Sequence, residues 1–405
     1  MGRNSYSHSR RAYMKAIGGV SALGTASLAG CVGEDSDDVL IGNTTALTGA
    51  MSSYGPYIRD GLEYAAQQIN DEGGVLGREL RILTEDNESD PETAATTALR
   101  QMDEGAVAVT GPVLSDVSIR VRHETEAQQV PFLPIQGASP RLLDKDTRYT
   151  FRVGALPAPY YARATGEFVE HIGADNYGAI VADYSYGHSY QEGIEEFVKP
   201  IGGLNTQVEL APAGADDFSS QLRAMPDDIE YMDLGGHPVG IFTIIPQMWE
   251  VGLDPDATSG PGDPLPIFYD ALGDDVDRGI TQIHMVDPTT DEYVDVAQQY
   301  YEETDEFFDP FTTFGYVTAQ LVAEAIEDAG EADPQAVRDA ISDIRFDSLL
   351  AYPLEYNEWG ELTDSKLQVL EFNLDSPPYY PDGDFYVESL FETNTFEPLD
   401  PDEWE

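Results

Sequence analysis

Cysteine is almost absent from this chain, because Cys31 is the only one among 405 residues. A single cysteine excludes an internal disulfide, and the six scattered histidines form no metal-binding pattern with it. The sequence also lacks a Gly-x-Ser-x-Gly elbow, a glycine-rich phosphate loop followed by Lys-Ser or Lys-Thr, and a His-Glu-x-x-His pair. We therefore expect no enzymatic activity, no cofactor and no metal.

Basic residues are also scarce, with 21 Lys and Arg against 75 Asp and Glu and a formal net charge of −54. Residues 1–30 hold four of the basic residues and no acidic residue, which leaves −58 on residues 31–405. This charge would repel the phosphates of a nucleic acid. Because 41% of the residues are apolar, we expect a folded core under a solvated acidic surface of the halophilic kind.

Long apolar runs are absent as well, since no segment reaches the roughly twenty residues that span a bilayer. A short apolar stretch, residues 16–29, lies between the paired Arg10 and Arg11 and the cysteine Cys31. This order resembles a twin-arginine export signal that ends in a lipoprotein attachment site. We expect residues 1–31 to be that signal and residues 32–38 an acidic tether. The body would then be lipid-anchored, extracellular, at the outer face of the cell membrane.

Strand-like and helix-like segments alternate along the rest of the chain. The pattern predicts parallel βαβ units, and about 370 residues are too many for one core, so we expect two α/β domains. The predicted strands are 39–41, 79–83, 106–109 and 132–135, then 177–181, 205–210, 229–232, 241–245 (or a helix there) and 265–268. The predicted helices are 61–69, 92–102, 118–128, 295–303, 312–329 and 334–344.

Several short motifs carry a resemblance to a known family. In order they are ALTGA at 46–50, INDEGGVLGR at 69–78, EDNESDP at 85–91, GPVLS at 111–115, VPF at 130–132, GASP at 137–140, DYSYG at 183–187, DDFS at 216–219, GY at 315–316 and PLEYNEWG at 353–360. Their order and spacing resemble the branched-chain amino acid (Leu/Ile/Val) type periplasmic substrate-binding proteins of ABC transporters. The resemblance covers residues 39–375.

The family's fold implies two similar Rossmann-like lobes with a central ligand cleft and a three-strand hinge, the type I periplasmic-binding-protein arrangement. The lobes are expected at 39–153 plus 285–344 and at 154–284 plus 345–390. Residues 391–405 form an acidic tail that packs on the second lobe or frays. Ligand would be held between the lobes and enclosed by a hinge motion.

The carboxylate half of the expected site lies at the ends of two predicted strands. Ser115 opens a predicted helix, and Ser139 precedes Pro140, so backbone amides there would point into the cleft. In the resembled family these positions, with the backbone of Gly137 and Ala138, hold the carboxylate of an amino acid. The alternative is that both serines only cap helices.

The aromatic half comes from the resemblance too, which places Tyr54 and Tyr186 in the cleft on opposite lobes. An isolated tyrosine is otherwise more often part of the core or rim.

The ammonium half departs from the family pattern. Family members place a Tyr after a Gly-Gly pair, but His237 follows this pair here, either as an altered ligand position or as a rim residue. They also place an acid after the strand expected at 265–268. The best-matching position holds Leu272, and Asp270 lies two residues earlier. Either Asp270 serves as the ammonium partner, or the ligand carries no amine.

These expectations combine into an exported, monomeric binding protein that delivers a small polar solute to an ABC permease and its ATPase. A branched-chain or other amino acid is the first expected ligand. Urea, a short amide or a small carboxylate is the alternative ligand class. A ligand-sensing receptor module would use the same cleft.

Overall fold

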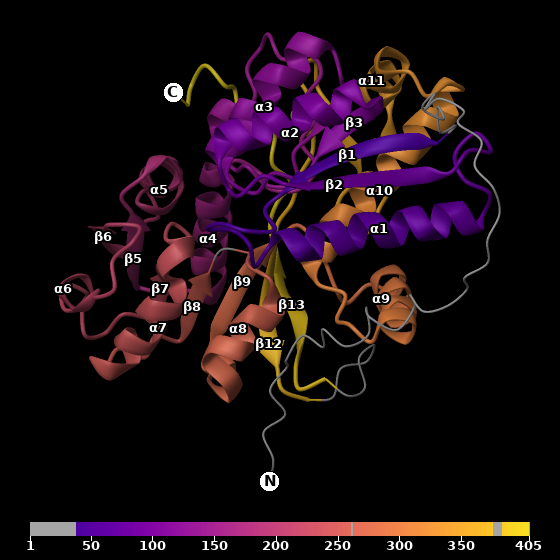
Figure 1. Ribbon diagram of the computed structural model, residues 1–405. Coiled ribbons are helices and arrows are strands. Elements are labelled where there is room, and N and C mark those ends of the chain that lie inside the picture. The colour runs from indigo at the N-terminus through magenta and orange to yellow at the C-terminus, as the bar shows by residue number, and fades with distance from the viewer. Residues whose placement is uncertain (1–37, 261, 376–382, 405) are drawn as a thin grey trace, which may run out of the picture. The chain divides into compact units, whose positions relative to one another are not determined.

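A computed structural model describes residues 38–260, 262–375 and 383–404 (Figure 1). The predicted signal, with Arg10, Arg11 and Cys31, lies outside these residues, as does the predicted tether up to residue 37. In the described part of the chain no helix is both long and apolar enough to cross a membrane.

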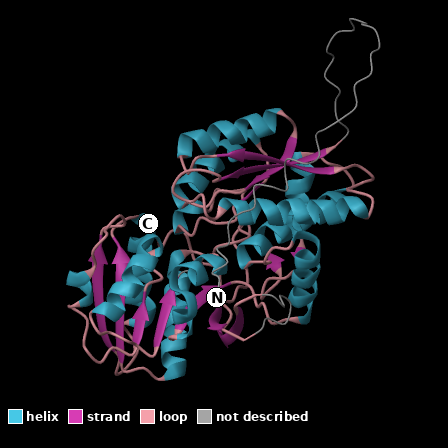
Figure 2. Ribbon diagram, turned by 60° about the horizontal axis from the view of Figure 1, so that its bottom comes forward, coloured by secondary structure: helices cyan, strands magenta, loops and turns pink. Residues whose placement is uncertain are grey.

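The first sheet has four parallel strands in the order β2-β1-β3-β4. Its strands match the four predicted near the start of the chain, and their buried side chains include Val39, Ile41 and Ala108. Figure 2 shows helices on both faces of this sheet. The strands are β1 (Val39–Thr45), β2 (Leu80–Asp86), β3 (Ala106–Thr110) and β4 (Phe132–Leu133).

The second sheet has seven strands in the order β13-β12-β9-β8-β7-β5-β6. Five of them are parallel, and β12 pairs antiparallel with both β9 and β13. The strands are β5 (Asn176–Ala182), β6 (Asn205–Ala211), β7 (Tyr231–Asp233), β8 (Ala257–Gly260), β9 (Ile280–His284), β12 (Gln368–Asn373) and β13 (Tyr386–Glu392). A separate two-stranded pair is formed by β10 (Arg345–Phe346) and β11 (Leu354–Glu355).

Helices connect the strands, and α1 packs on α10 beside the first sheet. The predicted helices are confirmed, and several begin earlier than expected, such as α1 and α3, which begin at Gly55 and Ser115. In chain order they are α1 (Gly55–Asp71), α2 (Pro91–Asp103), α3 (Ser115–Gln128), α4 (Ala158–Ile172), α5 (Ser185–Gly193), α6 (Ser219–Leu222), α7 (Ile241–Glu250), α8 (Leu265–Leu272), α9 (Asp291–Thr304), α10 (Pro310–Ala329) and α11 (Pro334–Asp343).

The strand predicted at 265–268 is wrong. These residues begin helix α8, and the strand of this region is β8, eight residues earlier. Pro264 and Pro266 suit the start of a helix, where the amide that proline lacks would have no partner. Strand β8 reads Ala-Thr-Ser-Gly and has no apolar run, so periodicity does not reveal it. The segment at 241–245 takes its helical alternative, in α7.

The chain passes between the two sheets at three places, as the fold prediction requires. These crossings follow β4, follow β9 and precede β12. At the second, Ala351 N donates to Met285 O at 2.9 Å, so two crossing segments lie side by side. The expected lobe boundaries stay a prediction.

The last residues of the chain pack on α4 and its neighbours. Phe396 is buried against Tyr160, with ring centroids 5.1 Å apart, and Arg163 lies over the Phe396 ring. Trp404 is buried and stacks with Phe197. The described part of the predicted tail is therefore packed rather than frayed.

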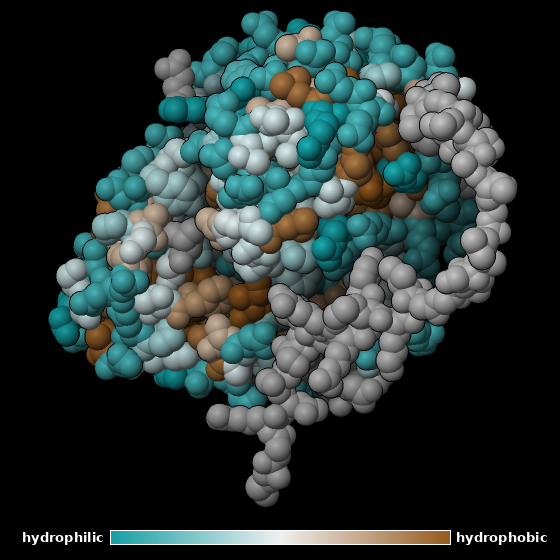
Figure 3. Space-filling model, in the orientation of Figure 1, coloured by the Kyte–Doolittle hydropathy of each residue, from teal (hydrophilic) through white to brown (hydrophobic). Residues whose placement is uncertain are grey.

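The surface is mostly polar. Figure 3 shows hydrophilic residues over most of the visible face outside the grey atoms, with smaller hydrophobic areas between them. Four large apolar side chains in the described residues are exposed, and they are Leu76, Ile172, Leu210 and Leu390. These four residues lie on different elements and are far apart in the sequence. Most other apolar side chains of the described residues are buried or partly buried.

Candidate ligand-binding site

A cavity of about 280 Å³ is lined by loops and helix starts, some of which follow strands of the first sheet and others strands of the second. Small-molecule sites commonly have roughly 300–1,000 Å³, so this cavity suits a small solute. Its lining combines aromatic rings, small residues and a few polar groups. The residues are Met51, Tyr54, Val113, Leu114, Ser115, Asp116, Gln136, Gly137, Ala138, Ala155, Tyr161, Tyr184, Ser185, Tyr186, Pro238, Gly262, Asp263 and Phe311.

Four helices begin at this cavity. Tyr54 is the N-cap of α1, Ser115 is the first residue of α3, Tyr184 is the N-cap of α5, and Phe311 is the second residue of α10. The amides of a first helical turn have no partner within the helix and carry partial positive charge. The starts of α1, α3 and α5 therefore favour a negatively charged group in the cavity, whereas the Phe311 amide of α10 is already bound by Asp309.

The loop at Gln136 to Ala138 turns its carbonyl groups away from the cavity. Gly137 O accepts from Arg152 Nη1 at 3.0 Å, and Ala138 O accepts from Ala158 N at 2.7 Å. Gly137 has φ +115°, and a Cβ there would lie 2.8 Å from Ser118 Oγ. Glycine is thus required at the residue where the main chain approaches the cavity.

Arg152 supports this loop from behind and was not anticipated from the sequence. Its side chain is 1% exposed and forms an ion pair with Glu361 through Nε, at 2.8 Å. Its Nη1 also donates to Ala155 O at 2.9 Å, so one guanidinium joins the loop, the first crossing segment and the residue Glu361. Glu361 balances the charge of this buried guanidinium, so Arg152 holds the loop in place without adding net positive charge beside the cavity.

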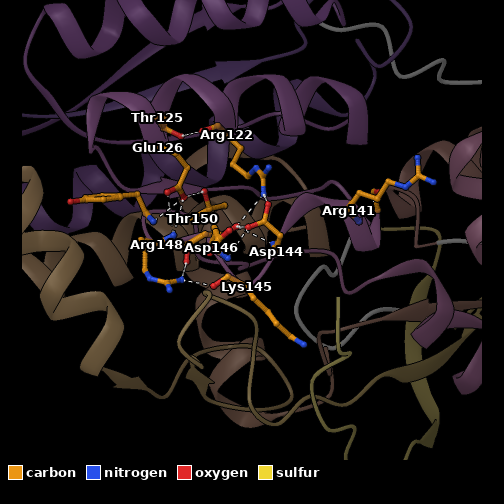
Figure 4. Close-up of polar contacts among 12 residues, drawn as sticks. Arg122, Thr125, Glu126, Arg141, Asp144, Lys145, Asp146, Arg148 and Thr150 are labelled. Atoms are coloured by element: carbon orange, nitrogen blue, oxygen red, sulfur yellow. Dashed lines mark hydrogen bonds and ion pairs between the residues drawn. The ribbon is translucent and has the colours of Figure 1, made fainter. Parts of the chain in front are cut away.

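Helix α3 is anchored to the segment that leads into this crossing (Figure 4). Arg122 Nη1 donates to Asp144 Oδ2 at 2.8 Å, and Glu126 Oε1 accepts from Tyr149 N at 2.8 Å and Thr150 Oγ1 at 2.9 Å. The view shows Arg141 pointing away from this group. These contacts hold the helix that begins with Ser115 against the segment that carries Arg152.

Asp263 is the buried acid of the cavity. Its side chain is 2% exposed, its Oδ1 accepts from Tyr54 Oη at 2.5 Å, and its Oδ2 has no partner in the described residues. Burial, together with the charge of Asp309, raises the pKa of Asp263 to about 7, against the donation from Tyr54. A buried carboxylate oxygen without a donor is a position prepared for a ligand group that donates hydrogen bonds.

Tyrosine hydroxyls surround Asp263. Tyr54, Tyr184 and Tyr186 all have pKa values raised by burial first, with the charge of Asp263 as a further cause, so each remains a neutral donor. Tyr186 Oη donates to Gly235 O at 3.2 Å. The Tyr54 ring packs edge to face on Phe311, with centroids 5.3 Å apart. The apolar part of a ligand would contact these rings.

The structure brings together five of the predicted site residues, namely Tyr54, Ser115, Gly137, Ala138 and Tyr186. Three others do not line the cavity. Ser139 caps a short 3-10 helix, η1 (Pro140–Leu142), by accepting from Arg141 N at 3.2 Å. His237 is buried against Phe218, and Asp270 is exposed on α8.

The prediction of Asp270 depends on a strand at 265–268, where the structure has helix α8. The expected acid follows a strand, and the strand is β8, so the acid after it is Asp263. The signal that could have found Asp263 is the Gly-Asp-Pro sequence at 262–264, a loop between a short polar segment and a helix that starts with proline.

Comparisons with known proteins agree with this architecture. A family model described as periplasmic binding protein matches residues 38–366. The chain belongs to the periplasmic binding protein family. Members of this family are extracytoplasmic and serve as substrate-binding components of ABC transporters.

Individual members of the family are distant in sequence. A Leu/Ile/Val-binding protein homolog 1 of Brucella abortus is 25% identical over 328 residues, 80% of this chain and 87% of the relative. A leucine-, isoleucine-, valine-, threonine- and alanine-binding protein of Pseudomonas aeruginosa is 24% identical over 346 residues, 84% of this chain and 91% of the relative.

Solved structures share the fold. The substrate-binding protein LivJ of Streptococcus pneumoniae, in complex with isoleucine, has a TM-score of 0.72 at 19% identity and covers 82% of this chain and 96% of its own. A solute-binding protein of Rhodopseudomonas palustris BisB5, in complex with 3,4-dihydroxybenzoic acid, has a TM-score of 0.74 at 18% identity and covers 91% and 99%. The type I periplasmic-binding fold is therefore established for this chain, and neighbours of that fold hold different solutes.

Proposed function

We propose that this periplasmic binding protein captures an α-amino acid with an apolar side chain outside the cell and delivers it to an ABC permease. The observation that carries the proposal is Asp263, a buried carboxylate with one unpartnered oxygen in a cavity lined by helix starts. An α-amino acid presents an ammonium and a carboxylate a few ångströms apart. The cavity offers a matching acid and a matching group of amides.

In this proposal the ligand carboxylate binds at the start of α3. Ser115 and the main chain of Gly137 and Ala138 line the cavity there, and buried Arg152 holds this loop in place by donating to Gly137 O. The ligand ammonium binds Asp263. Among the lining residues, Val113, Leu114 and Phe311 offer apolar contacts for the ligand side chain.

The names of the relatives support this ligand class, because several curated relatives are Leu/Ile/Val-binding proteins. Tyr54 and Asp263 are 209 residues apart and hydrogen-bond across the cavity. A hinge motion that brings the two lobes together would enclose the solute beside this contact. The lipid anchor at Cys31 and the monomeric state stay predictions from the sequence.

A second candidate ligand is an aromatic or other small carboxylate without an amine. Two structural neighbours were solved with benzoate and with 3,4-dihydroxybenzoic acid. The aromatic lining and the raised pKa of Asp263 favour this alternative, because a protonated Asp263 needs no cation. Urea and short amides remain in the same class of ligands without a charged amine.

A binding experiment separates these ligand classes. Residues 32–405 are screened by thermal shift and isothermal titration in concentrated KCl against leucine, isoleucine, valine, benzoate, urea and acetamide. We expect a branched-chain amino acid to raise the melting temperature, because a ligand that binds only the folded state stabilises it. We also expect Asp263→Asn to weaken its affinity at least about a hundredfold, since an ammonium left without its buried partner costs several kcal/mol.

The matched control is Asp270→Asn, which removes an exposed acid of α8 and should leave affinity unchanged. A shift with benzoate or amides alone, unaffected by Asp263→Asn, would replace the amino acid by the second ligand class. Loss of affinity in Asp270→Asn but not in Asp263→Asn would contradict the site assignment. No shift with any compound would contradict both ligand classes and favour the sensing role.

A further inference from the structure

A buried carboxylate next to the cavity, that of Asp309, binds the starts of two different helices. Asp309 is 0% exposed. Its Oδ1 accepts from Phe311 N of α10 at 2.8 Å, and its Oδ2 accepts from Leu265 N of α8 at 2.8 Å. Phe311 lines the cavity, and Leu265 lies two residues after Asp263. The two oxygens therefore hold both segments that flank the ligand position.

These contacts form a closed ring around one side of the cavity. Tyr54 donates to Asp263, and the Tyr54 ring packs on Phe311. Phe311 N and Leu265 N are both bound by Asp309, and Leu265 follows Asp263 through Pro264. A displacement of Asp309 would thus be transmitted to Asp263 along the chain and to Tyr54 through Phe311.

Two other helices of this chain start with the same Asp-Pro pair and show what capping alone requires. Asp90 caps α2 and Asp333 caps α11, each through its own helix amides, and both are exposed. Only Asp309 among these three acids is buried and also binds a second helix. Burial of a carboxylate is costly, so its placement here serves more than the cap of α10.

We propose that Asp309 is a positioning residue of the ligand site, which sets the place of Asp263 and Phe311 and, through its charge, the pH range in which Asp263 accepts a cationic group. This inference rests on the proposed function for its ligand. It extends that function by a residue that does not line the cavity and by a proton linkage.

Among the residues that the structure describes, no cation compensates the charge of either acid. Asp263 is faced by Tyr54 from α1, by Tyr184 and Tyr186 from α5, and by Gln282 of β9, which accepts from Asp263 N at 3.1 Å. His284 is bonded to Gln282, and burial lowers its pKa to about 3, so it is neutral.

Asp309 itself is faced by Tyr57 of α1. In the described residues neither Asp263 nor Asp309 forms an ion pair with a lysine or an arginine. Burial raises the pKa of Asp309 to about 7, against the donations from Phe311 N and Leu265 N, and the pKa of Asp263 to about the same value.

This arrangement links ligand binding to protons. An ammonium ligand binds the charged form of Asp263, so affinity should rise as the pH passes upward through about 7. Asp309→Asn removes the neighbouring negative charge, which lowers the pKa of Asp263. The rise in affinity should therefore move to lower pH in this variant.

The test compares Asp309→Asn and Asp309→Ala with Asp333→Asn and Asp333→Ala, which change an exposed Asp-Pro cap away from the cavity. Affinity for the amino acid that binds the wild type is measured from pH 5.5 to 8.5 at constant salt. Hydrogen exchange of the ligand-free protein is followed at Leu265 and Phe311. The thermal midpoint of each ligand-free protein is measured over the same pH range.

We expect both Asp309 variants to speed exchange at Leu265 or Phe311 and to weaken binding at pH 8 by about tenfold, since the amide or alanine leaves at least one main-chain donor unpaired. We expect the affinity profile of Asp309→Asn to move to lower pH. The Asp333 variants should keep the wild-type profile and exchange. Identical pH profiles for Asp309→Asn and the wild type, or unchanged exchange at both amides, would overturn the proposal.

The ligand-free measurements keep this test separate from the proposed function. The pKa of Asp309 is near 7 in the folded state and near 4 in an unfolded chain, so the folded state loses stability as pH rises from about 4 to about 7. Asparagine carries no such proton. The midpoint of Asp309→Asn minus that of the wild type should therefore increase from pH 5.5 to 8. A flat difference contradicts the inference even if no solute binds.

Discussion

Individual buried charges in this chain are concentrated near the cavity and its supports. Arg152 pairs with Glu361 behind the Gly137 loop, Asp263 lines the cavity, and Asp309 binds the helix starts beside it. Asp233 is buried as well and accepts from Tyr177 Oη at 2.5 Å and Gly235 N at 2.9 Å, while burial raises its pKa to about 6. Gly235 O in turn accepts from Tyr186, so this acid supports the loop against which Tyr186 lies.

Removal of one partner from the buried ion pair of Arg152 and Glu361 should lower the stability of the fold strongly. We expect Glu361→Gln to lower the free energy of unfolding by about 3 kcal/mol, because it leaves a buried guanidinium without a compensating charge. Urea unfolding at constant salt measures this change without altering ionic strength. Glu358→Gln, at an exposed position of the same turn, should cost less than about 0.5 kcal/mol. Equal losses in the two variants would contradict the role of the pair.

At the scale of elements, the helices α1 and α10 are packed unusually closely through two glycines. A Cβ on Gly61 would lie 1.9 Å from Thr312 O, and one on Gly315 would lie 2.2 Å from Ile58 O. The main chains of the two helices therefore meet at the first turns of α10, next to Asp309 and Phe311. This contact fixes the position of α10 relative to α1 and therefore the position of Phe311 at the cavity.

Gly315→Ala should separate these helices. Overpacking of this kind costs roughly 1–3 kcal/mol and outweighs the better helix propensity of alanine, which is worth about 1 kcal/mol. We expect a net loss of about 1 to 2 kcal/mol in urea unfolding, together with weaker ligand binding, since Phe311 moves with the helix. Gly202→Ala is the control, because nothing lies within 4 Å of a Cβ at Gly202 and its φ is not positive. Equal stability of the two variants would show that the helices adjust without strain.

At the scale of the whole molecule, the excess of acidic residues dominates the electrostatics. The net charge of −54 belongs to a chain whose described ion pairs are mostly exposed, such as Arg278 with Asp254 and Lys145 with Asp400. Exposed pairs add little stability each, so they do not offset the repulsion among the remaining acids.

Salt should therefore stabilise this protein strongly. The Debye length falls from about 10 Å at 0.1 M to about 3 Å at 1 M, which confines the repulsion to near neighbours. We expect the thermal midpoint, followed by circular dichroism, to rise steadily between 0.1 M and 3 M KCl. Sucrose at matched osmolality serves as the uncharged control and should raise the midpoint less. A midpoint that does not change with KCl would contradict the halophilic interpretation of the composition.

The sequence by itself determined the fold class and the strand and helix order of the first half, and it predicted five of the residues that line the cavity. Strands β1 to β4 and helix α3 follow from alternation and loop composition, which depend on neighbouring residues. Ser115 could be placed because the ends of parallel strands meet at one edge of a sheet, whereas Gly137 and Ala138 follow from the family resemblance. The strand and helix predictions depend on patterns that are local in the chain.

Only the tertiary structure shows which acids are buried beside the cavity. Asp263 follows a strand of small polar residues, Leu265 N and Asp309 are 44 residues apart, and Arg152 and Glu361 are 209 residues apart. A chain with 75 acidic residues gives no local reason to choose these acids over the others. What distinguishes them is burial beside partners distant in sequence, and burial arises only when the two sheets and their crossings come together.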